Sequence, residues 1–255
     1  AAITVNNTDG TCTANITNNL SNRRLTINGA MQVAQRGTST TTSGDFPVDR
    51  FMALFGGTDE APTFAQHALT SSDTGPYAKG FRHSLHITNG DQSNGAGTGD
   101  YIAVDYRLEA QDIANSGWNY TSSSSFITFS FWIKSSVSQN FYVTLKTENG
   151  TSQNYAFQTG SLSANTWTKV TKTISGNSNL TFNNVTTEGL QFLIAPFQGT
   201  DLTASSVTLN QWAAYASGTR APDYTSTWYT TNDATFELTG VQLEVGSVAT
   251  DFEHR

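Results

Sequence analysis

Aromatic side chains are the residues of this chain whose type and position best suit contact with a ligand. Flat rings in polar, turn-rich segments can stack on the C–H faces of sugars, while neighbouring Asn, Gln and Asp bind hydroxyl groups. Such rings also suit protein interfaces and the ends of a β-sandwich, and that structural role is the alternative for each of them. The six candidate glycan-stacking residues are Trp118, Trp132, Trp212, Tyr215, Tyr224 and Trp228.

The four histidines, His67, His83, His86 and His254, stand in no recognisable catalytic motif. His83 and His86 lie three residues apart, but a metal site needs a third ligand that the sequence does not indicate. We therefore predict that the histidines lie at the surface or at strand edges. No metal site is predicted from them.

Paired carboxylates for glycoside hydrolysis are another chemical option, but their spacing in a β-rich chain does not reveal which of them meet. The chain contains no G-x-S-x-G elbow, Walker loop or dinucleotide-binding fingerprint. We predict a protein without enzymatic activity, with a polysaccharide-degrading enzyme as the less favoured alternative. The acidic residues considered are Asp105, Glu109, Asp112, Glu148, Glu188 and Asp201.

The loop Asp91–Asp100 (DQSNGAGTGD) has oxygen ligands and glycines that suit a calcium ion. It lacks the bidentate Glu that completes a helix-flanked calcium loop, and glycine-rich connections are common without metal. No cofactor is predicted, and a structural calcium ion is left open.

Composition excludes several classes of partner. The formal net charge is −7, so the concentrated basic surface that nucleic acid requires is not expected. No run of 18 apolar residues is present, so no membrane insertion is predicted. Only 13% of residues are charged, and Thr, Ser and Asn supply most of the polarity, which disfavours an all-helical fold. The single cysteine, Cys12, cannot form an internal disulfide.

Short alternating segments separated by turn signals predict an all-β sandwich. Residues 127, 129, 131 and 133 are apolar and share one face of a half-buried strand, as do residues 141, 143 and 145. Gly240 interrupts the alternation of the last strand, which predicts a β-bulge there. The expected strands are Phe51–Phe55, Phe64–Leu69, Phe81–Ile87, Tyr101–Arg107, Phe126–Lys134, Phe141–Thr147, Asn154–Gln158, Trp167–Ile174, Leu190–Ala195, Ser206–Trp212 and Thr235–Val245.

The chain divides into three segments. Residues 1–22 contain almost no bulky side chain and cannot form a core of their own. We predict that residues 1–26 are an extended arm for attachment or oligomerisation, ordered by a neighbouring subunit or assembly. Residues 27–50 are expected to be a connector, and residues 51–255 the sandwich domain.

An ordered set of segments resembles a widespread family of phage virion proteins. The segments are INGAMQVAQRGTS at 27–39, DR at 49–50, FRHS at 81–84, RLEAQDI at 107–113, TFSFWIKS at 128–135, NTW at 165–167 and TGVQLEVGSVATDFEHR at 239–255. The resemblance implies a carbohydrate-binding-module-like jelly-roll domain, a place on the virion and often a homotrimer. It implies no particular ligand residues.

Together these features lead us to expect a virion structural protein on the phage particle surface or tail. We expect it to be a tail fibre or fibre-like appendage that contributes to host-surface glycan recognition. The expected partners are sister subunits in a homotrimer, other virion proteins through the N-terminal arm, and a host cell-surface glycan. The alternative is a capsid decoration, head-fibre or tail-assembly protein that binds no sugar.

Overall fold

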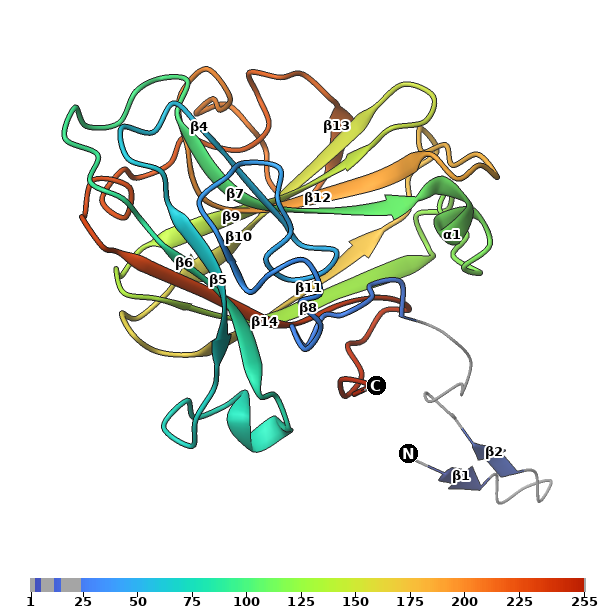
Figure 1. Ribbon diagram of the computed structural model, residues 1–255. Helices are drawn as coiled ribbons and strands as arrows, with labels where there is room; N and C mark the ends of the chain where they lie inside the picture. The colour runs from blue at the N-terminus through green and yellow to red at the C-terminus, as the bar shows by residue number, and fades with distance from the viewer. Residues whose placement is uncertain (1–2, 6–11, 15–23, 255) are drawn as a thin grey trace.

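The computed structural model describes residues 3–5, 12–14 and 24–254, and residues 24–254 form an all-β sandwich of the jelly-roll type (Figure 1). The first sheet has the order β13 (Trp212–Ala214), β10 (Gln153–Ser161), β9 (Asn140–Thr147), β12 (Glu188–Gln198), β7 (Tyr101–Glu109), β4 (Met52–Gly56). The second has the order β11 (Thr168–Ser175), β8 (Phe126–Ser135), β14 (Thr235–Val245), β6 (His83–Thr88), β5 (Thr63–Ala68), β3 (Ser39–Thr40).

Helical structure is minor in the described residues. It consists of α1 (Ala110–Ala114) and the single 3-10 turn η1 (Tyr77–Lys79). No helix in this part of the chain has the length and apolar character needed to cross a membrane. This low helical content agrees with the composition, which disfavoured an all-helical fold.

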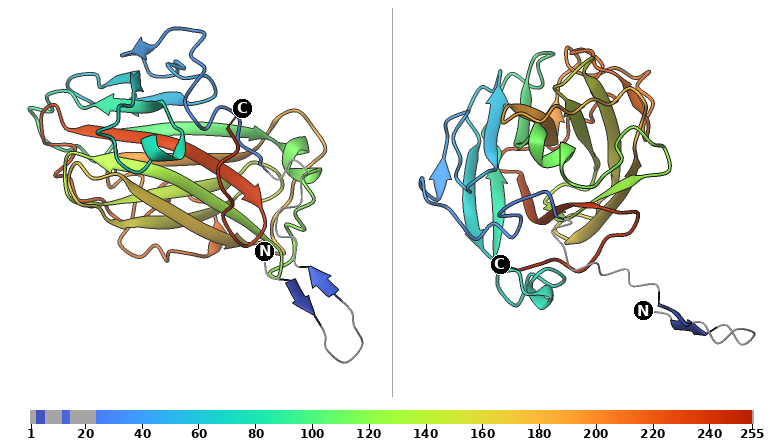
Figure 2. Two further views of the ribbon diagram at one scale, coloured as in Figure 1. Left: turned by 90° about the horizontal axis from the view of Figure 1, so that it is seen from below. Right: turned by 90° about the vertical axis from the view of Figure 1, so that its right-hand side faces the viewer.

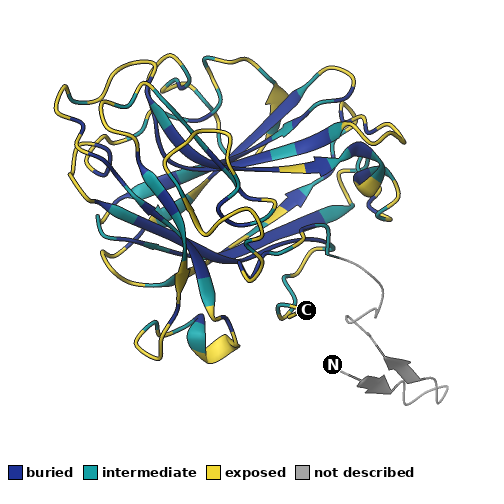
Figure 3. Ribbon diagram, viewed as in Figure 1, coloured by how far each residue is buried: buried dark blue, intermediate teal, exposed yellow. Residues whose placement is uncertain are grey.

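The core lies between the two sheets, which pack face to face (Figures 2 and 3). The inward residues predicted on β8, at positions 127, 129, 131 and 133, are all fully buried, as are those at 141, 143 and 145 on β9. Rings from opposite sheets meet in the middle, with Phe129 4.7 Å from Phe192 and Phe141 5.1 Å from Phe236 between centroids. Alternation thus identified the core face of both strands.

Two local expectations were wrong. The polar side of β8 is not simply half-buried: Thr128 is fully buried and donates its hydroxyl hydrogen to the Gly246 carbonyl at 2.7 Å, because the chain after β14 covers it. The segment Ser206–Trp212 is not a strand, since turns occupy 205–206 and 209–210, and Asn210 has a positive φ of 67°. The strand begins only at Trp212.

Residues 24–50 pack on the sandwich. The Leu25 N–H donates to the Leu243 carbonyl at 2.7 Å, and Met31 and Val48 are fully buried members of the main core. Within the predicted arm, β1 (Ile3–Val5) and β2 (Cys12–Ala14) pair as antiparallel strands. The rest of the arm up to residue 23 lies outside the described residues, as does Arg255.

Candidate functional site

The outer face of the second sheet carries a groove around Trp132. Alternation along β8 buries Phe131 and Ile133 in the core, so the side chain of Trp132 between them points outward. The groove has a volume of about 350 Å³. Its lining consists of Ala78, Lys79, Phe81, Ser130, Trp132, Lys169, Gly240, Thr250, Asp251, Phe252 and His254.

Three further rings pack together beside Trp132. Phe81 lies 4.8 Å from Phe252 and 4.7 Å from His254, and Phe252 lies 5.0 Å from His254, between ring centroids. The His254 Nε2 atom contacts the Lys79 carbonyl at 2.8 Å. The C-terminal segment is thereby fastened over Phe81 and forms one wall of the groove.

Glycine allows Trp132 and Phe81 to approach the backbone. Gly240 has a φ of 64°, and the pairing of β14 with β8 shifts register between Thr239 and Gln242, which confirms the predicted bulge. A Cβ atom at Gly240 would lie 2.8 Å from Phe81 and 3.1 Å from Trp132. On another side of the indole, a Cβ at Gly75 would lie 2.8 Å from the Trp132 ring. The indole is therefore held between two glycine backbones.

A charged network lies on the same face. The Lys134 ammonium is 2.7 Å from Glu237 and 3.0 Å from Asp73, and the Trp167 indole N–H also donates to Asp73 at 3.0 Å. Burial alone would raise the pKa of Glu237, but contacts with His86 and Lys134 lower it to about 2. The Glu237 carboxylate is therefore ionised over the whole physiological range.

Two of the six candidate rings are unavailable for stacking. Trp118 is 3% exposed and Trp228 is fully buried, and both belong to the main hydrophobic core. The Trp228 indole N–H donates to the Thr235 carbonyl at 3.0 Å. The structure therefore places these two candidates inside the core and not on an open surface.

The other three rings lie in a different region from Trp132. Trp212 packs on Tyr155 with ring centroids 5.2 Å apart, and its indole N–H donates to the Ser175 carbonyl at 2.9 Å. Apart from the bond to Ser175, which ends strand β11 of the second sheet, their contacts are with the first sheet and its loops. Tyr215 lies beneath the Lys146 ammonium at 4.5 Å, and Tyr224 packs edge-to-face on Tyr142 at 5.0 Å. The six candidates do not form one surface.

Some of the considered carboxylates do meet, on the outer face of the first sheet. Arg107 binds Asp105 at 2.9 Å and Glu188 at 3.2 Å, and Lys146 binds Glu148 at 2.5 Å. Burial raises the pKa of Asp105, with Arg107 opposing that rise. Burial also raises the pKa of Glu188. Asp105, Glu188 and Glu148 are therefore already paired with cations across β7, β9 and β12.

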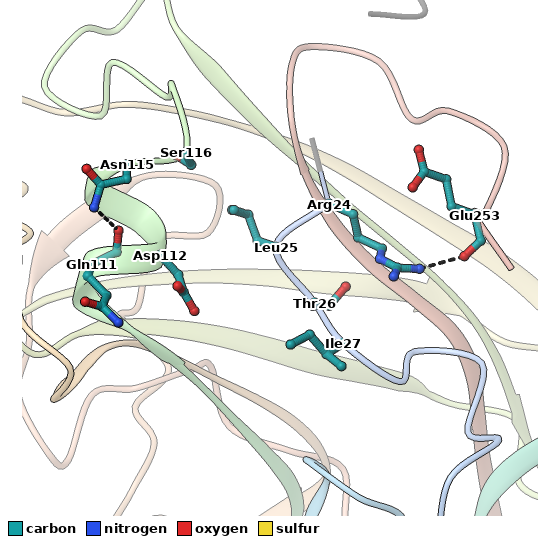
Figure 4. A pocket seen from close by; sticks show the side chains of 9 residues that line it. All are labelled: Arg24, Leu25, Thr26, Ile27, Gln111, Asp112, Asn115, Ser116 and Glu253. Carbon is teal, nitrogen blue, oxygen red and sulfur yellow. Dashed lines mark hydrogen bonds between the residues drawn. The ribbon is translucent and has the colours of Figure 1, made fainter. Parts of the chain in front are cut away.

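A cavity of about 480 Å³ lies where residues 24–27 pass helix α1 (Figure 4). The Arg24 guanidinium donates to the Glu253 carbonyl at 2.6 Å, and the Asn115 amide donates to the Gln111 carbonyl at 2.8 Å. No aromatic ring is found among the described residues that line it, which are Arg24, Leu25, Thr26, Ile27, Gln111, Asp112, Asn115, Ser116 and Glu253. It offers no platform for stacking.

The loop Asp91–Asp100 uses one of its carboxylates internally. Asp100 accepts hydrogen bonds from the Gly97 N–H at 2.6 Å and from the Tyr229 hydroxyl at 2.9 Å. The backbone N–H and side-chain amide of Asn94 both donate to Asp59 at 2.7 Å. These bonds order the loop through its own residues and through Asp59 and Tyr229.

Sequence reasoning missed Phe81, Phe252 and His254 as groove residues. Phe81 reads as the start of an ordinary strand, and the other two lie in a polar terminal segment. The signal that could have found them is the phase change at Gly240, because a bulge leaves room for bulky neighbours on the outer face.

No family model matches this chain, and no curated protein matches it either. Among solved structures it is similar to the tailspike protein 4 enzymatically active domain of bacteriophage CBA120, at 10% identity and a TM-score of 0.43 over 88% of this chain and 22% of that one. It is also similar to a structure described as "CBM4 structure and function", at 13% identity and a TM-score of 0.42 over 86% of this chain and 99% of that one. A family 30 carbohydrate binding module is similar at 10% identity and a TM-score of 0.32 over 86% of each chain.

Proposed function

We propose that this chain is a non-enzymatic phage virion protein of the tail-fibre type, whose jelly-roll domain binds host-surface glycan through the groove around Trp132. The observation that carries the proposal is the half-buried Trp132 indole in an open groove whose lining also includes Ser130, Lys169 and Asp251. An aromatic platform with a few polar groups around it is the usual make-up of a small-ligand site. The resemblance of residues 27–255 to phage virion proteins supports the placement on a virion.

Several copies of the groove on one particle would compensate for weak glycan binding at each of them. Three subunits in a homotrimer, each with its own groove, raise the overall affinity through effective concentration without any new contact. In this proposal residues 1–26 attach the protein to sister subunits or to other virion proteins. Size-exclusion chromatography with light scattering measures the oligomeric state directly, and a monomer would remove the avidity argument.

The absence of catalysis in this proposal rests on the ion pairs of the first sheet. Asp105 and Glu188 share Arg107. In this proposal each carboxylate is bound to that cation and does not face a substrate. A hydrolase would release reducing ends from host polysaccharide, and substitution of an Asp or Glu would abolish that release. Detection of such activity would contradict the proposal.

The test is a pair of matched Trp→Ala variants. Trp132→Ala removes the platform of the groove and is expected to weaken glycan binding and host-cell adsorption by tenfold or more, on the order of 2 kcal/mol for a central aromatic contact. Trp212→Ala removes a ring of the same size from the other sheet and is expected to leave binding unchanged. Glycan arrays and adsorption assays give the readouts, and circular dichroism confirms that both variants fold. Equal binding by Trp132→Ala and the parent would overturn the assignment.

The alternative is a decoration, head-fibre or tail-assembly protein without sugar binding. It is favoured by one observation, that five of the six candidate rings pack on this chain's own groups or lie within its core. Localisation in the intact particle by cryo-electron microscopy separates the two functions. A position at the tail tip supports adsorption, and a position in the capsid lattice supports decoration.

A further inference from the structure

Three neighbouring strands of the second sheet bring two histidines and a glutamate together on the outer face. In the register of the sheet, His86 on β6 lies directly opposite Glu237 on β14, and on its other side it faces Ala65 on β5. His67 is two residues further along β5 and on the same face, so its side chain is the diagonal neighbour of His86. The two imidazole centroids are 5.1 Å apart.

The candidate ligand atoms are close enough to share one ion. All three lie within 4.8 Å of one another. The His67 Nδ1 atom is 3.5 Å from Oε2 of Glu237, and the His86 Nδ1 atom is 3.6 Å from Oε1. Ligands bound at about 2.0–2.1 Å around a tetrahedral zinc ion are separated by roughly 3.3–3.4 Å. Small side-chain rotations are enough to reach that arrangement.

The His86 Nδ1 atom is an unsatisfied group. It is buried and has no hydrogen-bond partner, and 3.6 Å is too long for a hydrogen bond to Glu237. Buried polar atoms in folded proteins nearly always have a partner. The His86 Nδ1 atom lies near a carboxylate and a second imidazole, and its missing partner calls for an explanation. A metal ion bound to Nδ1 provides one.

We propose that His67, His86 and Glu237 form a binding site for a divalent transition-metal ion of the zinc type, with solvent in the remaining position. Two imidazoles and one carboxylate favour such an ion over calcium or magnesium, which prefer all-oxygen ligand sets. The His67 side chain is 53% exposed, so an ion can enter from solvent without opening the sheet. The site lies outside the groove around Trp132 and does not depend on glycan binding.

Glu237 is already held in place for this role. The Ser84 hydroxyl donates to its Oε2 atom at 2.9 Å, and the Lys134 ammonium lies 2.7 Å from its Oε1 atom. Such outer contacts orient a ligating carboxylate. Lys134 also opposes a second cation by charge repulsion, but Asp73 at 3.0 Å from Lys134 offsets its charge. Oε2 lies beside His67, and its second lone pair, the one not used by the Ser84 hydroxyl, is available to a metal.

The experiment is isothermal titration of tag-free protein with Zn²⁺, with Ca²⁺ and Mg²⁺ titrated in parallel. The parent chain is expected to bind one Zn²⁺ saturably, to show a higher melting temperature with Zn²⁺ present, and to bind neither Ca²⁺ nor Mg²⁺ at this site. His67→Gln and His86→Gln are each expected to lose that binding, and Ser84→Ala to weaken it about tenfold.

The matched control is His83→Gln, which removes an imidazole from the same strand. The His83 Nδ1 atom contacts the Gln32 side chain at 3.0 Å and is not part of the cluster, so this variant is expected to bind Zn²⁺ like the parent. Because His67 is exposed, His67→Gln is expected to fold even if the His86 variant does not. Zn²⁺ binding by folded His67→Gln equal to the parent's, or no saturable Zn²⁺ binding by the parent, would overturn the proposal. Anomalous diffraction at the zinc edge would place the ion.

Discussion

Asp105 on the outer face of the first sheet and Glu237 on the outer face of the second are each a buried carboxylate beside a cation, yet the two differ in proton affinity. Asp105 on the first sheet is fully buried, with the Arg107 guanidinium at 2.9 Å. Glu237 on the second sheet is 3% exposed, with the Lys134 ammonium at 2.7 Å. The pKa of Asp105 is raised above its ordinary value, whereas that of Glu237 is lowered to about 2.

The difference follows from the neighbours of each pair. Burial raises the pKa of both groups. Around Asp105 the Arg107 cation is shared with Glu188, and the negative charge of Glu148 adds to the rise. Around Glu237, the effects of His86 and Lys134 on the pKa outweigh the effect of burial. The pKa of a buried carboxylate is therefore set by the balance of all the charges around it. A single ion pair does not by itself determine whether the ionised form is favoured.

The largest expected effect comes from removing the charge on the second face. Glu237→Gln leaves Lys134 with only Asp73 as an anionic partner, and should lower the free energy of unfolding at pH 7 by about 2–3 kcal/mol. Urea unfolding in buffer with a chelator measures this without a contribution from bound metal. If Glu237→Gln lowers the free energy of unfolding no more than Asp105→Asn does, the two carboxylates do not differ in the way proposed here.

The second face also carries the bulge at Gly240, which packs against Phe81 and Trp132. Gly240→Ala should lower the free energy of unfolding by about 2 kcal/mol, because φ is 64° and the new Cβ would lie 2.8 Å from Phe81. Gly95→Ala is the control, since Gly95 has a φ of 80° but no atom within 4 Å of a Cβ, so only about 1 kcal/mol of backbone strain is expected. Equal losses in the two variants would show that packing against Phe81 is not restrictive.

The third prediction concerns pH. Burial opposes ionisation of Asp73, but hydrogen bonds from Thr70 and Trp167 and the contact with Lys134 lower its pKa from 3.8 to about 2. The resulting stabilisation is fully present above pH 3.8 and disappears as the pH falls through about 2.

Asp73→Asn should therefore cost about 1 kcal/mol at pH 7, a value reduced for solvent screening. The difference between variant and parent should close between about pH 4 and pH 2. Thermal unfolding across that range measures it. A difference independent of pH would show that Asp73 acts through the shape of its loop and not through its charge.

The smallest effect is expected on the first face. The raised pKa of Asp105 means that ionisation opposes folding: the stability linked to this group is present below its unfolded pKa and is lost as pH rises through its folded pKa. Asp105→Asn removes that cost at pH 7 and leaves Arg107 paired with Glu188, so the free energy of unfolding should change by no more than about 0.5 kcal/mol. A loss above about 2 kcal/mol would show that the Asp105–Arg107 contact dominates.

Much of the architecture could be predicted from local pattern. The inward positions of β8 and β9 and the bulge at Gly240 are properties of residues adjacent in sequence, and the structure confirms them. The strand predicted at Ser206–Trp212 failed for an equally local reason, since Asn210 adopts a left-handed conformation that the pattern did not reveal. Of the six candidate rings, Trp132 lines the groove on the second sheet and the other five lie elsewhere.

What the sequence determined by itself is the two-layer β body, because strand alternation depends only on which successive residues are apolar. Which residues become neighbours across strands was decided by tertiary structure. The chain after β14 closes over Phe81 and builds one wall of the groove, and the pairing of β5, β6 and β14 places His67, His86 and Glu237 together. Several of these contacts join residues far apart in the sequence, such as Ser84 and Glu237, which are 153 positions apart. Strand order sets them, and local pattern does not encode strand order.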